Sequence, residues 1–150
     1  MIVPQTIPST RSPQLNDVPR LSELSGQLGY PVSQVELGRR LTYLLTRPDH
    51  HLVLAETGRD QVVGWIHAAE QWVLESEPAC EILGLVVDQS YRCQGVGRTL
   101  VAAVEAWAGT RGITTIKVRT NVVRSESHPF YERLGYARVK SQHVYRKLLG

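Results

Sequence analysis

The chain has 150 residues and a net charge of +3, and it is 42% apolar and 21% charged. These values are typical of one globular domain, residues 1–150, and exclude collagen-like, low-complexity and disordered classes. No apolar run approaches the roughly 20 residues that a membrane span needs. Residues 1–13 lack the apolar core of a signal peptide, and two cysteines suggest reduced thiols, so we expect a cytoplasmic protein.

The first third of the chain predicts two helices. Residues 1–13 are rich in Pro, Ser and Thr, and we expect them to be flexible or to begin with a short strand. Asp17 is a candidate N-cap, and apolar residues follow at helical spacing until Gly29. Ser33 and Glu36 have the spacing of a capping box, and the pattern after them predicts a second amphipathic helix.

The apolar period then becomes that of strands. The expected strands are residues 51–56, 61–74, 80–87, 114–119 and 136–148. We expect a turn at residues 75–78. The expected helices are residues 96–111 and 127–134. The hairpin pattern implies antiparallel pairing, whereas the strand–helix–strand unit from Cys80 to Arg119 implies a parallel crossover. We therefore predict an α/β fold with a mixed, mostly antiparallel sheet and helices on both faces. Gly84, inside a strand, suggests a bulge or a close approach by another group.

A segment with two glycines joins the third of these strands to the next helix. Within residues 88–100, DQSYRCQGVGRTL, Gly95 and Gly97 stand where the turn enters the helix. Glycine allows positive φ and close approach of a ligand to the backbone. Free N–H groups at a helix N-terminus bind anions, and Arg92 and Arg98 add positive charge. The segment therefore predicts a phosphate or pyrophosphate site.

Two of three known glycine-rich designs do not fit this segment. A Walker loop needs Gly-Lys-Ser/Thr, but Arg98 follows Gly97 here, and no glycine lies five residues before Gly97. A dinucleotide fingerprint needs a third glycine where Leu100 stands. Residues 92–97 do match the pattern Arg/Gln-x-x-Gly-x-Gly/Ala.

With this loop the sequence resembles the GNAT superfamily of N-acetyltransferases. Residues 81–87 match the strand before the loop, residues 119–121 match the end of the next strand, and residues 127–136 match the family's Phe-Tyr and Gly-Tyr element. Order and spacing agree over residues 50–148. The resemblance implies that acetyl-CoA is the cosubstrate, that no metal is needed, and that an amine attacks the thioester directly.

The resemblance also implies roles for individual residues. Tyr131 is at the position of the general acid, with packing against CoA as the alternative. Glu81 matches a strand glutamate that serves as base, often through water, with a surface strand residue as the alternative. Cys93 replaces a frequent glycine of the loop. The residues implied in acetyl-CoA binding are Leu85, Val86, Val87, Arg92, Cys93, Gln94, Gly95, Val96, Gly97, Arg98, Asn121, Arg124 and Phe130.

We accordingly expect an enzyme that acetylates a primary amine of a small molecule. The alternatives are a protein or peptide N-acetyltransferase and a non-catalytic, acetyl-CoA-binding regulatory module. The C-terminal half is similar to aminoalkylphosphonate and aminoglycoside N-acetyltransferases, and no residue identifies the amine. Glu70, Glu75 and Glu77 are candidates for an acidic lip that would attract a cationic amine, or for a solvated turn.

The basic residues concentrate at the C-terminal end of the chain. Residues 111–150 carry nine Lys and Arg against Glu126 and Glu132, and thus a net charge of +7. An anionic cosubstrate accounts for much of this charge, so we expect neither a nucleic acid nor a membrane as partner. The resemblance to the GNAT family suggests that the protein forms a homodimer.

Overall fold

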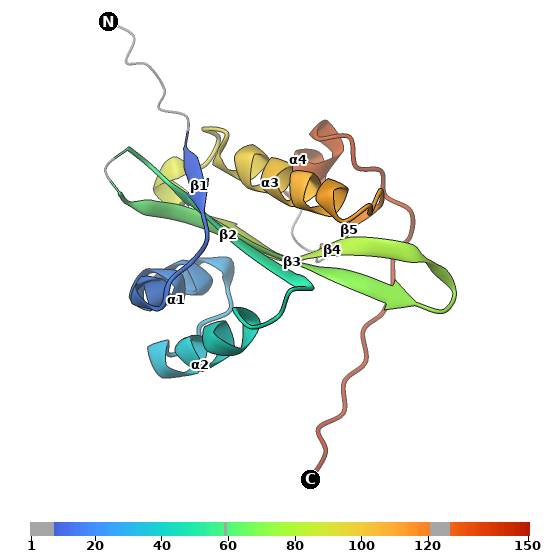
Figure 1. Cartoon of the computed structure of the whole chain (residues 1–150), viewed down its shortest axis with the longest axis horizontal. Helices are drawn as coiled ribbons and strands as arrows, with labels where there is room; N and C mark the ends of the chain where they lie inside the picture. Colours follow the sequence, from blue (N-terminus) through green and yellow to red (C-terminus); the bar gives the residue numbers. More distant parts are fainter. Residues whose placement is uncertain (1–7, 59, 121–126) are drawn as a thin grey trace, which may run out of the picture. The chain divides into compact units, whose positions relative to one another are not determined.

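The computed structural model describes residues 8–58, 60–120 and 127–150. Its contacts divide the chain into two units, one ending at Arg119 and one beginning at Thr120. The two units are described separately. The first unit contains a sheet with helices on both of its faces (Figure 1).

The sheet has five strands whose order in space is their order in the chain. The strands are β1 (Ser9–Arg11), β2 (His50–Glu56), β3 (Val62–Val73), β4 (Ser76–Val87) and β5 (Ile116–Val118). Neighbours pair antiparallel from β1 to β4, and β4 pairs with β5 in parallel. The prediction of a mixed, mostly antiparallel sheet is confirmed.

Amphipathic helices cover both faces of this sheet (Figure 1). On one face, α1 (Val18–Leu28) and α2 (Gln34–Leu44) bury Leu21, Leu24 and Leu41 in a core that includes Leu54 of β2. On the other face lies α3 (Val96–Thr110), whose buried residues are Val96, Leu100, Val101, Val104 and Ala108. Helical spacing gathers these apolar residues on one side of each helix, and their burial stabilises the layers. No helix in the described residues is long and apolar enough to cross a membrane.

The helix ends confirm most of the predicted caps. The Ser33 hydroxyl accepts a hydrogen bond from the N–H of Glu36 at 3.1 Å, and Gly29 ends α1 with φ 96°. Asp17 is the N-cap residue of α1, but its carboxylate makes no capping bond to that helix. The carboxylate instead receives two hydrogen bonds from Arg11, both 2.8 Å long, because β1 brings this guanidinium beside it.

Two features of the sheet differ from the sequence prediction. β4 begins at Ser76, so the residues expected as a turn at 75–78 mostly belong to the strand. Residues 9–11, within the segment expected to be flexible or to begin with a strand, form β1. The β3–β4 register shifts between the His67 and Ala68 pairs, where Leu83 has no partner, which confirms the bulge suggested by Gly84.

The second unit contains the helix α4 (Ser127–Arg133). Gly135 follows it with φ 93°, as expected of a helix end. The strand predicted over residues 136–148 is wrong, because residues 137–150 form no regular element. Among the described residues no strand pairs with this segment, and Val139, Val144 and Tyr145 are exposed.

Candidate active site

The glycine-rich loop takes the conformation that its glycines predict. After β4 a short 3-10 turn, η2 (Gln89–Tyr91), leads to Gly95, the N-cap residue of α3, with φ 85°. No heavy atom lies within 4 Å of the place where a Cβ on Gly95 would be. Cys93 also has a positive φ, 62°, although it is not glycine. This explains why related loops often carry glycine there, and it strains the Cys93 backbone.

The N-terminus of α3 has the properties of an anion site. No side chain caps it, and the first bond of the helix runs from the N–H of Thr99 to the carbonyl of Gly95 at 3.0 Å. The N–H groups of Val96, Gly97 and Arg98 precede that bond and are therefore free of helical partners. Aligned N–H groups and the helix dipole favour a phosphate at this point. The loop thus fits the pyrophosphate of acetyl-CoA.

Helix α1 holds the beginning of this loop in place. Arg20 donates a hydrogen bond to the carbonyl of Val62 at 2.8 Å and forms an ion pair with Asp88. The N–H of Ser90 and this guanidinium hold the pKa of Asp88 below its usual range. The N–H of Gln89 also donates to Oε1 of Gln27 in α1 at 2.9 Å. Two side chains of one helix therefore position the loop.

Strand β4 loses its outer neighbour before it reaches the loop. Its parallel partner β5 pairs only with Cys80, Glu81 and Ile82. Among the described residues, β3 is the only strand that pairs with Leu85, Val86 and Val87 as they continue toward the loop. An extended pantetheine chain can lie along such an open edge, as the resemblance implies. Among the cosubstrate residues expected from the sequence, the structure therefore brings 85–87 and 92–98 into one continuous segment.

Glu81 is buried on the face of the sheet that α1 and α2 cover. It lies opposite Ala69, which follows Trp65 and His67 on the same face of β3. Its Oε2 accepts a hydrogen bond from Gln71 at 2.9 Å, and its Oε1 pairs with Nε of Arg119 at 3.0 Å. Each oxygen has capacity for a further hydrogen bond, and the side chain as a whole is 7% exposed.

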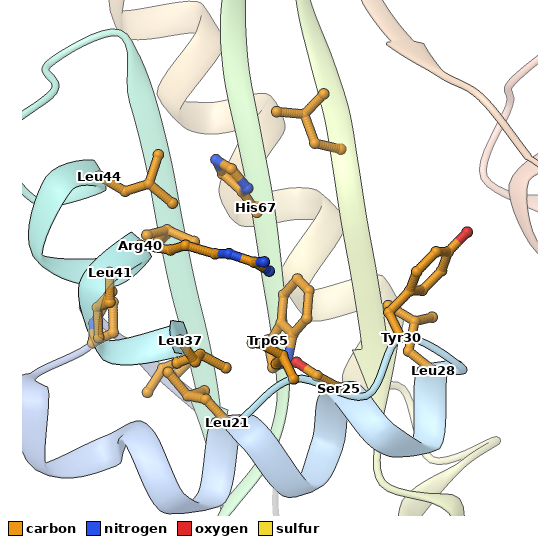
Figure 2. Close-up of a pocket in the computed structure, with 15 residues that line it drawn as sticks. Leu21, Ser25, Leu28, Tyr30, Leu37, Arg40, Leu41, Leu44, Trp65 and His67 are labelled. Atoms are coloured by element: carbon orange, nitrogen blue, oxygen red, sulfur yellow. The ribbon is translucent and has the colours of Figure 1, made fainter. Parts of the chain in front are cut away.

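A cavity of about 460 Å³ opens between α1, α2 and this face of the sheet (Figure 2). Eight of its fifteen lining residues are leucines. Its polar groups come from Ser25, Tyr30, Arg40, Trp65 and His67. Glu81 does not line the cavity; it pairs with Ala69, two positions or about 7 Å beyond the lining residue His67 along β3, on the same face of the sheet.

The sequence analysis missed a pair of histidines at this cavity. Nδ1 of His50 and Nε2 of His67 are 2.9 Å apart, within hydrogen-bond distance. Burial and the neighbouring His50 lower the pKa of His67 to about 4, so its ring is neutral at pH 7. The hairpin register predicts such a diagonal pair, since His50 lies opposite Ala69 and His67 opposite Leu52. In the described part of the chain no three His, Cys, Asp or Glu side chains gather around a metal site.

The expected acidic lip does not form at the cavity. Glu70 accepts two hydrogen bonds from Arg111, at 2.6 and 3.1 Å, on the opposite face of the sheet. Glu75 and Glu77 are exposed at the β3–β4 turn. None of the three glutamates lines the cavity.

The close approach that the sequence suggested at Gly84 is made by the protein itself. A Cβ at Gly84 would lie 2.9 Å from Cη2 and Cζ3 of Trp65. The group that approaches is therefore an indole of the protein.

The proposed general acid lies in the second unit. The ring of Tyr131 packs against the rings of Phe130 and Tyr136, with centroids 5.0 and 5.7 Å apart. Burial raises the pKa of Tyr131 to about 12, so its phenol keeps its proton at neutral pH. Asn121 and Arg124, which were also expected at the cosubstrate, lie outside the described residues.

Solved structures of similar fold include acetyltransferases. The aminoglycoside 6'-N-acetyltransferase AAC(6')-Ih from Acinetobacter baumannii is 21% identical, with a TM-score of 0.83 over 96% of this chain and 100% of that one. AAC(6')-Iy in complex with CoA is 21% identical, with a TM-score of 0.84 over 97% and 99% of the two chains. A putative acetyltransferase from Agrobacterium tumefaciens is 23% identical, with a TM-score of 0.81 over 93% and 99%. At these identities the likeness establishes the fold.

The family is established by sequence. No curated protein matches the chain. A family model described as "Acetyltransferase (GNAT) family" matches residues 18–136, which include the glycine-rich loop, strand β4 and helix α4. The expectations of a GNAT fold and of an acyltransferase that uses acetyl-CoA are therefore confirmed. The chain belongs to the acetyltransferase (GNAT) family.

Proposed function

We propose that the protein transfers the acetyl group of acetyl-CoA to a primary amine of a small molecule. The observation that carries this proposal is the uncapped N-terminus of α3. The glycine-rich loop connects this N-terminus to β4, a strand with an open edge. The cavity beside Glu81 supplies a site for the acceptor. Its volume falls in the range of small-molecule sites, which is about 300–1,000 Å³. Several solved structures of similar fold are described as aminoglycoside N-acetyltransferases, which supports a small-molecule acceptor.

We assign the cosubstrate to the loop and to the open edge of β4. The N–H groups of residues 94–98 would bind the pyrophosphate, with Arg92 and Arg98 adding charge. Leu85, Val86 and Val87 would align the pantetheine, and a backbone N–H near Val86 would polarise the thioester carbonyl. Cys93 lies in the same loop. We also assign Phe130, Asn121 and Arg124 to the binding of acetyl-CoA.

Acetyl-CoA supplies an activated acetyl group, and side chains of the protein manage the protons. An ammonium must first lose one proton, for which Glu81 is the proposed acceptor, directly or through water. The amine nitrogen then bonds to the carbonyl carbon, and the C–S electrons leave with the sulfur. The nitrogen loses a second proton, and the sulfur gains one from Tyr131. The products are an amide, CoA thiol and one released proton.

Thermal unfolding with and without acetyl-CoA tests the proposal together with a CoA-release screen over small amines, polyamines, aminophosphonates, aminoglycosides and peptides. Acetyl-CoA at 100 times its Kd should stabilise the protein by about 2.7 kcal/mol. Tyr131→Phe should keep this stabilisation and lose about 100-fold or more in kcat.

Each alternative has its own outcome. Stabilisation without turnover would favour the regulatory module, and turnover only on peptides would favour the protein N-acetyltransferase. An unchanged unfolding temperature would overturn the cosubstrate site. Full activity of Tyr131→Phe would remove only the assignment of the general acid.

Family resemblance also leads us to propose a cytoplasmic homodimer. The exposed apolar side chains of residues 137–150 are candidates for its contact surface, including Val144 and Leu148. Light scattering of the full chain measures the oligomeric state.

A further inference from the structure

We propose that the acceptor is an amine with an apolar body and one acidic group, a carboxylate or a phosphonate, and that Arg40 binds this group. The inference rests on the proposed function, because it names the substrate class of the same cavity. Its basis is the chemistry of the cavity wall, which differs from what a polycationic acceptor requires.

The wall of the cavity is apolar and contains no anion. Leucines from α1, α2 and the two strands β2 and β4 make up most of it, and none of its lining residues is Asp or Glu. An aminoglycoside carries several ammonium groups. Buried ammonium groups without carboxylate partners are strongly disfavoured. The cavity therefore selects against such polycations, although fold neighbours are described as enzymes that act on them.

Arg40 is the lining residue with a permanent charge. It extends from α2 across the cavity toward Trp65 and His67 (Figure 2). Its Nε donates to Oε1 of Glu36 at 3.1 Å, which leaves both Nη groups without a partner among the described residues. Arg39 pairs with the same Oε1 at 2.6 Å. One carboxylate thus serves two guanidinium groups, and the cluster keeps a net positive charge.

The other polar groups of the cavity do not cancel this charge. His67 is neutral at pH 7, as its lowered pKa shows. The indole N–H of Trp65 is buried and has no hydrogen-bond partner in the structure. The site therefore offers a guanidinium, which recognises carboxylate and phosphonate oxygens by paired hydrogen bonds. The leucines around it suit a branched aliphatic or aromatic body.

The test compares acceptors that differ in one group. Initial rates of CoA release are measured for leucine against isoamylamine, for phenylalanine against phenethylamine, and for neamine. The phosphonate analogue of leucine distinguishes the two kinds of acidic group. We expect kcat/KM to be at least about tenfold higher for the acid-bearing member of each pair, the size of effect of a charged hydrogen bond. We expect neamine to be a poorer substrate than either acid.

A matched pair of variants locates the effect. Arg40→Gln should remove the preference for the acid, because kcat/KM for the acid should fall toward the value for the plain amine. Arg39→Gln is the control, since Arg39 is on the same helix, pairs with the same glutamate and does not line the cavity. It should keep the preference. Isoamylamine or neamine used as well as leucine, or a preference that survives Arg40→Gln, would overturn the inference and leave the proposed function intact. Stabilisation by acetyl-CoA without turnover of any amine would overturn both.

Discussion

Trp65 fills the space that Gly84 leaves beside it on the next strand. A methyl group on Gly84 would lie 2.9 Å from two indole carbons, closer than side-chain carbons pack. The same indole lines the acceptor cavity and joins the core beneath α1 and α2. The missing side chain of Gly84 therefore determines the shape of one cavity wall.

Gly84→Ala should displace Trp65. We expect the free energy of unfolding to fall by about 1–3 kcal/mol. The KM of the acceptor should rise, while the Kd of acetyl-CoA stays within about twofold. Denaturant unfolding and steady-state kinetics measure these effects. Gly109→Ala in α3 is the control, because nothing lies within 4 Å of the added methyl group and the change should stabilise the helix slightly. Equal effects of the two substitutions would contradict this account of Gly84.

Cys93→Gly should stabilise the protein by about 1 kcal/mol. Cys93 has φ 62°, where a side chain is strained and glycine is not. Acetyl-CoA binding should be kept, because the loop conformation does not change. Cys93→Val should act in the opposite direction, since a β-branched residue tolerates positive φ poorly. Thermal unfolding of the three proteins tests this ranking, and a glycine variant less stable than the parent would refute the strain.

Stability should decline as the pH falls from 6.5 toward 4. The folded protein holds the pKa of His67 near 4, against its usual value of 6.5, so the unfolded chain takes up this proton first. The contribution is complete well above pH 6.5 and amounts to about 3 kcal/mol. Urea unfolding across this range should show the slope in the parent and a weaker one in His67→Gln. His143→Gln, at an exposed position, should keep the parent's slope. A slope unaffected by His67→Gln would exclude His67 as its source.

Glu81→Gln should reduce kcat by about 100-fold or more, because an amide cannot accept the proton of the ammonium. The amide keeps the shape of the side chain and can still accept the hydrogen bond from Arg119, so the cosubstrate should still stabilise the variant. The nearby imidazole of His67 offers a second candidate base. Activity retained by Glu81→Gln and lost in His67→Gln would assign proton removal to His67.

Local signals in the sequence predicted much of the fold. Gly29 and Ser33 mark helix boundaries found in the structure, because a positive φ and a capping bond depend on adjacent residues only. The loop around Gly95 was predicted for the same reason. The strand expected over residues 136–148 was wrong, since a strand depends on a partner that local composition does not supply.

The side-chain partners at the site were harder to predict. The carboxylate of Asp17 bonds to Arg11, and Glu70 bonds to Arg111, because the register of the sheet and the ends of helices bring these groups together. The direction of Arg40 likewise depends on how α2 packs on the sheet. These relationships require the tertiary structure, whereas the residue types at Glu81 and Tyr131 pointed to chemistry directly.

Helix α1 belongs to two sites at once. Leu21, Ser25 and Leu28 form part of the cavity wall. Arg20 and Gln27 hold the beginning of the glycine-rich loop. An acceptor that shifts this helix must therefore also change the affinity for acetyl-CoA. Thermodynamic reciprocity then requires acetyl-CoA to change the affinity for the acceptor by the same factor.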